Sequence, residues 1–372
     1  MKVLTVVGAR PQFIKAAAVS RIMQETSDMQ EVLVHTGQHY DHSMSSIFFD
    51  ELGIRRPDYN LEVGSASHGA QTGRMLEAVE LVMMKERPDW VVVYGDTNST
   101  LAGTLAATKL HIPVAHVEAG LRSFNRRMPE EINRVMSDHA AEVLFAPTPA
   151  AVDNLRLEGI PSNRIVLVGD VMYDVAQYFG TKAEEQSQIL DRLGLKTGGY
   201  ILATIHRAEN TDTPSRLEAI FSGLADIARR IPVVIPLHPR TRAALGQIGM
   251  SQFMLQQLTI VDPVGYLDMV MLEKKARLIA TDSGGVQKEA FFHRVPCVTL
   301  RNETEWVELV QIGWNQLSPV RDKDGVVDDI FRMLSRRSLP SPPADLYGGG
   351  TASTKIVQQL RGGLPISGTS GP

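Results

Sequence analysis

Cysteine is nearly absent from this sequence, since Cys297 is the single cysteine among 372 residues. One cysteine can form neither an intramolecular disulfide nor a cysteine-based zinc site, so we expect a protein of the reducing cytoplasm. We interpret Cys297 as a small buried hydrophobic residue in a strand.

An excess of basic residues is also missing. The 38 Lys and Arg stand against 42 Asp and Glu, which gives a formal charge of −4. This balance argues against a protein that binds nucleic acid or an acidic membrane surface. Long apolar runs are absent too: no segment offers the roughly 18 predominantly apolar residues of a membrane-spanning helix. The apolar start at residues 3–7 is shorter than the core of a signal peptide.

Several common fingerprints are missing. The sequence contains no GxGxxG, no GxxxxGK[ST] and no HExxH, which removes the usual signatures of dinucleotide, nucleotide-triphosphate and zinc-protease sites. Asp322-Lys-Asp324 is interpreted as a solvated surface loop rather than a metal site. We therefore expect neither a metal nor a cofactor.

Short β-branched runs alternate with longer amphipathic stretches along the whole chain. The predicted strands are residues 2–7, 31–35, 90–94, 114–117, 143–146 and 165–168, then 200–204, 233–236, 258–261, 278–281 and 297–300. The predicted helices are residues 11–26, 71–87, 99–110 and 130–141, then 214–230, 267–275, 285–292 and 305–312. Continuous apolar strands are typical of parallel sheets covered on both faces. The pattern predicts an α/β protein with two doubly wound, Rossmann-like domains that face a central cleft.

The domain boundary is expected near residues 169–180. We predict an N-terminal domain over residues 1–170 and a C-terminal domain over 171–350. The last residues, 362–372, are rich in Gly, Pro, Ser and Thr and are expected to be disordered.

Polar clusters follow seven of the predicted strands, where ligands of open α/β sheets bind. They contain Arg10, Gln38 with His39, Asp96, Glu118, His206 with Arg207, His238 with Arg240, and Asp282 with residues 283–285. Polar loops are common, but seven at the same ends of strands predict a shared ligand site. His116 and His139 lie inside a predicted strand and a predicted helix, so structural roles are expected for them.

Ser283, Gly284 and Gly285 would open a helix directly after an apolar strand. Backbone N–H groups at a glycine-rich helix start favour a diphosphate. The alternative is a simple turn in which Ser283 caps the helix. Glu289 follows on the same helix and could bind the hydroxyl groups of a ribose.

Eight segments occur in a characteristic order: GARPQFIKAA, TGQHYD, VYGDTNSTLAG, AHVEAGLRS, MPEEINR, TIHRAEN, PLHPRT and TDSGGVQKEA. With them the chain resembles the non-hydrolysing UDP-N-acetylglucosamine 2-epimerases from residue 8 to about residue 300. The resemblance implies a two-domain fold of the GT-B type, with UDP held mainly by the C-terminal domain. It implies that a last helix at residues 351–361 joins the N-terminal domain. A cytoplasmic homodimer that serves cell-envelope polysaccharide synthesis is also implied.

The resemblance implies interconversion of UDP-N-acetylglucosamine and UDP-N-acetylmannosamine through loss and return of UDP. Asp96, Glu118 and Glu130 match the family's acid–base positions, and Glu131 is the alternative to Glu130. The groups that match the stabilisation of the leaving UDP are Arg10, Lys15, His206 and the backbone of Ser283, Gly284 and Gly285. A surface lysine is the competing interpretation of Lys15, and a core histidine that of His206.

Other positions depart from the family pattern. Many members have an arginine in a TERPE stretch where this chain reads TEWVE at residues 304–308, and Arg301 is a candidate substitute. Met269 matches a residue of the uracil pocket, although a core methionine is the alternative. The activator site of bacterial members matches here at Gln38, His39, Arg207 and His238. It departs at Tyr40 and Asp41, which leaves substrate activation open.

Three other functions remain for such a site. A hydrolase would release free N-acetylmannosamine and UDP. A glycosyltransferase of the same architecture would need an acceptor. A sugar-nucleotide sensor would bind without turnover, which leaves the three carboxylates unexplained.

Overall fold

The computed structural model describes residues 1–38, 55–250, 252–336, 338–341, 343 and 346–363. The chain divides into two compact units, which we call unit 1 and unit 2. Unit 1 consists of Met1–Val175 with Pro343–Pro372, and unit 2 consists of Ala176–Pro342. The division falls inside a helix, between Val175 and Ala176. Most of the predicted tail, residues 364–372, lies outside the described residues. Among the described residues, no helix combines the length and apolar character needed to cross a bilayer.

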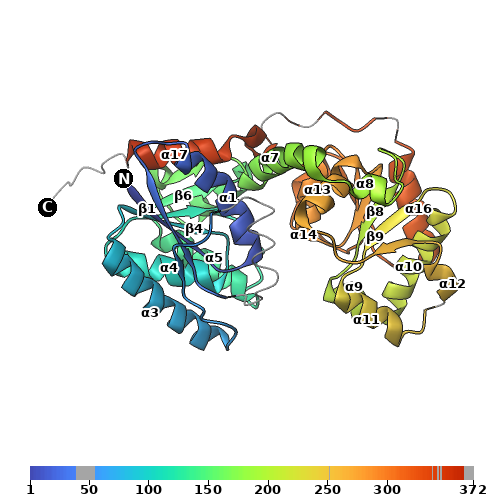
Figure 1. Ribbon diagram of the computed structural model, residues 1–372, viewed down its shortest axis with the longest axis horizontal. Coiled ribbons are helices and arrows are strands. Elements are labelled where there is room, and N and C mark those ends of the chain that lie inside the picture. Colours follow the sequence, from blue (N-terminus) through green and yellow to red (C-terminus); the bar gives the residue numbers. More distant parts are fainter. Residues whose placement is uncertain (39–54, 251, 337, 342, 344–345, 364–372) are drawn as a thin grey trace. The chain divides into compact units, whose positions relative to one another are not determined.

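Unit 1 is built on a parallel sheet (Figure 1). Its strands are β1 (Lys2–Val7), β2 (Gln30–His35), β3 (Tyr59–Asn60), β4 (Trp90–Tyr94), β5 (Val114–Val117), β6 (Val143–Ala146) and β7 (Ile165–Leu167). They lie in the order β3-β2-β1-β4-β5-β6-β7, and every neighbouring pair is parallel. The central strands β4, β5 and β6 are fully buried, which explains their continuous apolar sequences.

Helices cover the sheet of unit 1. They are α1 (Arg10–Gln24), α3 (His68–Glu86), α4 (Asn98–Lys109), α5 (Pro129–Ala140), α6 (Pro149–Leu157), the first part of α7 (Val171–Gln186) and α17 (Ala352–Gly362). Short 3₁₀ turns lie at η1 (Ser162–Arg164) and η2 (Leu346–Gly350). Pro11 lies in the first turn of α1, where its missing N–H leaves no helical bond unmade. Thr97 caps α4 by accepting a hydrogen bond from the Thr100 N–H.

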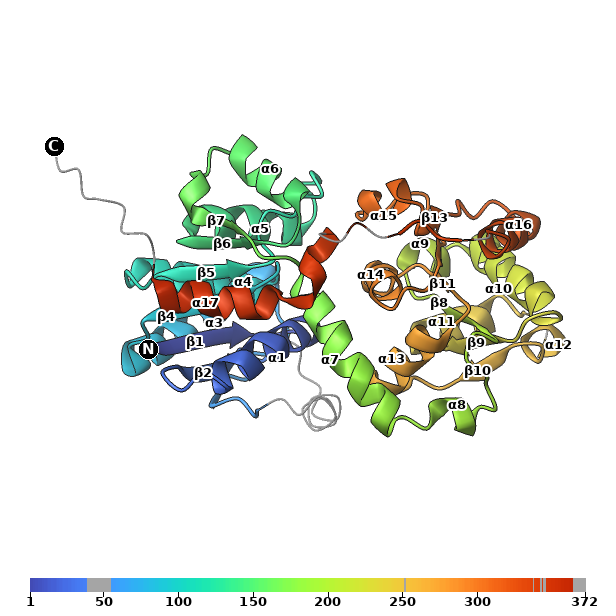
Figure 2. The same cartoon turned by 90° about the horizontal axis from the view of Figure 1, so that it is seen from above.

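The last helix returns to the start of the chain. Helix α17 packs beside α1, as Figures 1 and 2 both show, and Ile356, Val357 and Leu360 are buried. Its N-terminus is fixed by Asp174, whose carboxylate accepts hydrogen bonds from the Ala352 N–H at 3.1 Å and the Ser353 N–H at 2.8 Å. Residues from both ends of the sequence therefore build unit 1.

Unit 2 repeats the architecture with a second parallel sheet. Its strands are β8 (Ile201–Thr204), β9 (Val233–Pro236), β10 (Thr259–Val261), β11 (Leu278–Thr281), β12 (Cys297–Thr299) and β13 (Asn315–Leu317). The order is β10-β9-β8-β11-β12-β13, again with parallel neighbours. Both sheets place their first strand next to the fourth, the doubly wound arrangement. The prediction of two doubly wound α/β domains is confirmed.

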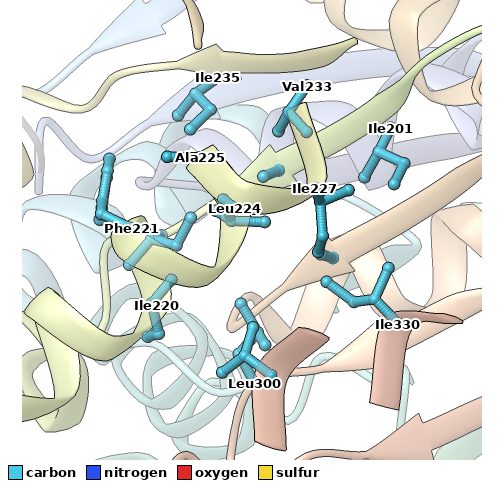
Figure 3. Close-up of a cluster of buried hydrophobic side chains, with 14 of the residues drawn as sticks. Ile201, Ile220, Phe221, Leu224, Ala225, Ile227, Val233, Ile235, Leu300 and Ile330 are labelled. Atoms are coloured by element: carbon cyan, nitrogen blue, oxygen red, sulfur yellow. The ribbon is translucent and has the colours of Figure 1, made fainter. Parts of the chain in front are cut away.

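The helices of unit 2 include the rest of α7. The others are α8 (Ile189–Arg192), α9 (Ala208–Thr211), α10 (Pro214–Ala228), α11 (Pro239–Gln247), α12 (Gln252–Leu255), α13 (Tyr266–Lys275), α14 (Gly284–Phe292), α15 (Val307–Gln311) and α16 (Lys323–Leu334). Figure 3 shows Leu224 and Ile227 of α10 packed among Ile201, Val233 and Ile330, which come from β8, β9 and α16. This apolar layer fixes the strand ends on which the candidate site is built.

Asp322, Lys323 and Asp324 are exposed, as predicted, but they start a helix rather than lie in a loop. Asp322 is the N-cap of α16 and accepts a hydrogen bond from the Gly325 N–H at 2.8 Å. Lys323 pairs with Asp226 at 2.8 Å. The helix forms because Val326, Ile330 and Met333 fall on one face and are buried.

Candidate active site

The ends of two neighbouring strands in unit 1 carry the first candidate carboxylates. Asp96 and Glu118 follow β4 and β5, which pair in parallel, so both residues lie at the same edge of the sheet. Gly95 has φ 62°, and a methyl group added to it would lie 3.3 Å from the Glu118 carboxylate. Glu118 itself has φ 72°, an unusual backbone for a residue with a side chain. The turns after both strands are therefore tightly specified.

Lys15 lies against this pair of strand ends. Its ammonium group, on α1, contacts the carboxylate of Glu118, and the two side chains are only 13% and 10% exposed. This burial excludes the surface lysine that was the competing interpretation.

Arg134 links Asp96 to helix α5. One guanidinium nitrogen lies 2.6 Å from the Asp96 carboxylate and another lies 2.8 Å from Glu131. Burial alone would lower the pKa of Arg134, but the charges of Asp96 and Glu131 raise it. Asn133, one position earlier, donates to the Asp96 carbonyl at 2.9 Å. Arg134 ends the MPEEINR motif, but no role was predicted for it from the sequence.

The two adjacent glutamates of α5 have different environments. Glu131 is buried and accepts hydrogen bonds from the Ser123 N–H and hydroxyl and from the Phe124 N–H, all within 3.0 Å. Burial would raise the pKa of Glu131, but the Ser123 hydrogen bonds and Arg134 hold it below its usual value. Glu130 is exposed. Glu131 therefore serves the structure, which leaves Glu130 available for a ligand.

The remaining candidates of unit 1 are only partly described. Arg10 begins α1, while its side chain and the whole of His39 lie outside the described part of the structure. Gln38 accepts hydrogen bonds from the Ser99 N–H at 3.1 Å and the Ser99 hydroxyl at 2.7 Å. Its side-chain oxygen thus fixes the start of α4.

In unit 2, Asp282 organises the ends of β8 and β11. It accepts hydrogen bonds from the N–H groups of His206 and Arg207 and from Asn210, at 3.0 to 3.1 Å. The His206 ring nitrogen Nδ1 lies 3.3 Å from the same carboxylate. Burial raises the pKa of Asp282, but His206 and Asn210 hold it below its usual value. The His206 side chain is 41% exposed, so it is not the core histidine of the competing interpretation.

The helix start at residues 283–285 is only partly capped. Ser283 is the N-cap of α14, yet its side chain makes no capping hydrogen bond. Its own N–H donates to the Thr281 hydroxyl at 2.9 Å, so this N–H is already used. The first N–H groups inside an α-helix, here those of Gly284 and Gly285, have no intrahelical acceptor. These two groups can bind an anion.

Residues 304–306 wrap around this helix start. The Trp306 ring nitrogen donates to the Gly284 carbonyl at 2.9 Å, and the Thr304 hydroxyl donates to Gln287 at 2.6 Å. Glu305 is thereby held with its carboxylate against Gly284. From its sequence, this segment was recognisable only as a departure from the family pattern.

The Glu305 carboxylate also meets two cations. Arg301 donates to it at 2.8 Å, and an Arg207 nitrogen lies 3.7 Å away. Burial raises the pKa of Glu305, but its backbone hydrogen bond and Arg301 hold it below the usual value. A carboxylate thus occupies the place where two arginines and a helix start would bind an anionic ligand.

Glu289, Met269 and His238 are the remaining candidates of unit 2. Burial raises the pKa of Glu273 well above its usual range, and the contact with Glu289 raises it further. Met269 packs against a core cluster that includes Leu202 and Ile279. His238 caps α11, because its Nδ1 accepts the Arg240 N–H at 3.2 Å.

Comparison with known proteins identifies the family. The family model described as UDP-N-acetylglucosamine 2-epimerase matches residues 21–361. The chain belongs to this family. A UDP-2,3-diacetamido-2,3-dideoxy-D-glucuronate 2-epimerase from Pseudomonas aeruginosa is 52% identical, over 97% of this chain and 99% of that protein. A UDP-N-acetylglucosamine 2-epimerase from Methanocaldococcus jannaschii is 43% identical over 97% of this chain and 99% of its own length.

A solved structure from this family is also similar to this chain. The M. jannaschii enzyme in complex with UDP-GlcNAc and UDP has a TM-score of 0.82 and 43% identity, and the match covers 98% of this chain and all of that one. The predicted family and its GT-B-like fold are confirmed, and the protein is an epimerase, an isomerase by class. The roles of the individual site residues and the expected cleft stay predictions.

Proposed function

We propose that this epimerase interconverts UDP-N-acetylglucosamine and UDP-N-acetylmannosamine. The observation that carries the proposal is the arrangement of Asp96 and Glu118 at the ends of adjacent strands, with Lys15 against Glu118. Inversion at the second sugar carbon needs groups that remove a proton from one face and return one to the other. Membership of the family supports a sugar nucleotide as the substrate on which these groups act.

The proposed chemistry has two balanced steps. In the first, the bond between the anomeric carbon and the phosphate oxygen breaks, and UDP leaves with the electron pair. A carboxylate takes the proton from the second carbon, and a double bond forms between the two carbons to give 2-acetamidoglucal. In the second, UDP adds back to the anomeric carbon while a proton reaches the second carbon from the opposite face.

Asp96, Glu118 and Glu130 are the proposed acid–base groups. Arg134 contacts the Asp96 carboxylate and Lys15 contacts the Glu118 carboxylate, which fixes the positions of two of them. Glu130 is the one exposed on the first turn of its helix, while Glu131 is bound to backbone N–H groups.

Unit 2 is proposed to hold UDP during both steps. The N–H groups of Gly284 and Gly285, with His206 and Arg301, would stabilise the diphosphate as negative charge develops on it. Glu289 is proposed to bind the ribose, and Met269 to contact the uracil. From unit 1, Arg10 and Lys15 would add positive charge. No cofactor is proposed.

A second substrate is supported by one observation. The relative from P. aeruginosa, whose name gives a diacetamido-glucuronate sugar, is 52% identical to this chain, against 43% for the M. jannaschii enzyme. We therefore propose UDP-2,3-diacetamido-2,3-dideoxy-D-glucuronate as the alternative substrate. The same inversion at the second carbon applies to it. The ratio of kcat/KM for the two nucleotides decides between them.

We further propose a cytoplasmic homodimer that supplies precursors for cell-envelope polysaccharides. Support for the dimer comes from exposed apolar side chains on two helices that both pack against α4. They are Leu81 and Met84 on α3 and Ile132 and Met136 on α5. Light scattering of the purified protein tests this.

Substrate activation is proposed to act through Gln38, His39, Arg207 and His238. The shape of the curve of rate against substrate concentration tests it.

The central experiment is proton NMR of UDP-N-acetylglucosamine with the purified protein in deuterium oxide. We expect UDP-N-acetylmannosamine with deuterium at the second carbon. Asp96→Asn, Glu118→Gln and Glu130→Gln should each lower the rate of this exchange by about 10²-fold or more, since each removes one proton-transfer group at nearly constant size.

Each alternative function gives a different result in the same experiment. Free N-acetylmannosamine would indicate hydrolysis. Turnover that needs an added acceptor would indicate a glycosyltransferase. Binding of the nucleotide without any exchange would indicate a sensor. Normal exchange in all three variants would contradict the assignment of the acid–base residues.

A further inference from the structure

A buried ionic network lies beneath the two strand ends that carry Asp96 and Glu118. It consists of His116 on β5, Asp138 on α5, and Arg122. Their side chains are 0 to 1% exposed. His116 Nδ1 lies 2.7 Å from Asp138, and Asp138 lies 2.7 Å from Arg122. Arg122 also makes two hydrogen bonds of 2.7 Å with Glu158.

The hydrogen bond from His116 to Gly95 fixes one ring proton. Its Nε2 lies 2.7 Å from the Gly95 carbonyl oxygen, which can only accept, so Nε2 carries a proton. The other ring nitrogen, Nδ1, faces the Asp138 carboxylate. Burial raises the pKa of Asp138, but His116 and Arg122 hold it below its usual value. The ring thus bridges the Gly95 carbonyl and the Asp138 carboxylate, which Arg122 also contacts.

The network is hydrogen-bonded to the backbone close to each of the two candidate carboxylates. Gly95, held by His116, directly precedes Asp96. The Gly120 N–H, two residues after Glu118, donates to Asp138 at 3.1 Å. Gly95, Glu118 and Gly120 all have positive φ, at 62°, 72° and 81°. For Glu118, which has a side chain, this backbone is unfavourable, so surrounding contacts must impose it.

We propose that His116 is a positioning residue for the proton transfers of the epimerase, an inference that rests on the proposed function. Its hydrogen bond to the Gly95 carbonyl fixes the main chain that presents Asp96. Through Asp138 it also fixes the turn that presents Glu118. The network is sealed from solvent, so it acts on the substrate through these two turns.

Two substitutions separate the two hydrogen bonds of the ring. In His116→Gln the amide nitrogen can reach the place of Nε2 and still donate to Gly95. In His116→Asn it can reach the place of Nδ1 and donate to Asp138, but the bond to Gly95 is lost. Leu144→Ala is the stability control, because Leu144 pairs with His116 in the sheet and is fully buried but takes no part in the network.

The experiment measures deuterium exchange at the second carbon, the KM for the nucleotide, UDP affinity by calorimetry, and unfolding by urea. We expect His116→Asn to lower kcat for exchange about 30-fold or more, with UDP affinity within twofold of wild type. His116→Gln should keep kcat within about threefold. Leu144→Ala should lose stability but keep its kcat.

The inference is overturned if His116→Asn keeps wild-type kcat, or if Gln and Asn variants lose kcat equally and in proportion to stability. If His116→Asn does not fold, Asp138→Asn replaces it, and an unchanged kcat in that variant overturns the inference. Wild-type protein without exchange on either sugar nucleotide refutes the proposed function itself, whereas an active wild type with an active His116→Asn variant refutes the positioning role alone.

Discussion

The ammonium group of Lys15 contacts the carboxylate of Glu118, and both side chains are nearly buried. Replacing Lys15 with Met would leave the carboxylate without its cation. We expect C2 exchange to fall at least tenfold and the unfolding free energy to fall by about 3 kcal/mol, as for other broken buried pairs. Urea unfolding and NMR exchange measure the two effects.

A double variant tests whether the two effects have separate causes. Lys15→Met combined with Glu118→Gln removes the buried charge and should recover most of the lost stability. It should recover no exchange, because the proton-transfer group is gone. Recovery of exchange would contradict the role of Glu118.

Glu130 and Glu131 should respond in opposite ways to the same change. Glu130→Gln should leave the unfolding free energy within about 0.5 kcal/mol of wild type, because the side chain is exposed, and should abolish most exchange. Glu131→Gln weakens the hydrogen bonds to Ser123, Phe124 and Arg134. Its main effect should therefore be a lower unfolding free energy. If Glu131→Gln alone stops exchange in a stable protein, the acid–base assignment moves to Glu131.

Gly284 and Gly285 form a matched pair for the anion site. A methyl group at Gly284 would collide with the Glu305 carboxylate and cover the helix start, whereas at Gly285 it would meet only the Ser283 hydroxyl at 4.0 Å. We expect Gly284→Ala to weaken UDP binding about tenfold and Gly285→Ala to change it little. Calorimetry with UDP measures both, and equal affinities would argue against this helix start as the diphosphate site.

Glu305 should compete with UDP for the cations. Its carboxylate contacts Arg301 and lies near Arg207 and Gly284, so a bound diphosphate has to displace or face it. Glu305→Gln removes the repulsion at constant size, and we expect UDP affinity to rise about three- to tenfold at low ionic strength. Weaker UDP binding in this variant would show that Glu305 contacts the ligand favourably.

His293 predicts an acid-sensitive fold. Burial, with Lys274 nearby, lowers the pKa of His293 to about 4. Between pH 6.5 and pH 4 the unfolded chain binds a proton that the native state does not, so the unfolding free energy falls as pH falls. The loss should reach about 3 kcal/mol at pH 4.

His293→Gln isolates this contribution. The variant lacks the titrating ring, so its unfolding free energy should fall less steeply between pH 6.5 and pH 4. Parallel curves for both proteins, measured in urea, would rule out His293 as the source.

The sheets were predictable because their strands are short, apolar and buried on both faces. Every predicted strand of unit 1 is found, as at Trp90–Tyr94 and Val114–Val117. The polar strand Asn315–Leu317 was missed because its sequence carries no such pattern. Helix α6 was also missed, although Thr148 and Pro149 are ordinary signals of a helix start.

The candidate site was predictable only as far as strand ends reveal it. The positions of Asp96 and Glu118 follow from β4 and β5. The hydrogen bonds that occupy Glu131 depend on a turn in which Phe124 has φ 56°, and no sequence pattern indicates such a turn. The place of Glu305 likewise depends on how Thr304 and Trp306 fold back onto α14.

Because α17 packs against α1, unit 1 can be completed only after the last part of the polypeptide has been synthesised. Arg361 on α17 donates hydrogen bonds to Asp28, 333 positions earlier. A ribosome that adds roughly 5–20 residues per second needs about 15–70 seconds to cover that distance. Over this interval the nascent unit 1 lacks its final helix, and the apolar face of α1 that α17 later covers is exposed. Chaperone capture is therefore expected at that face, and it should end when the last helix emerges from the exit tunnel.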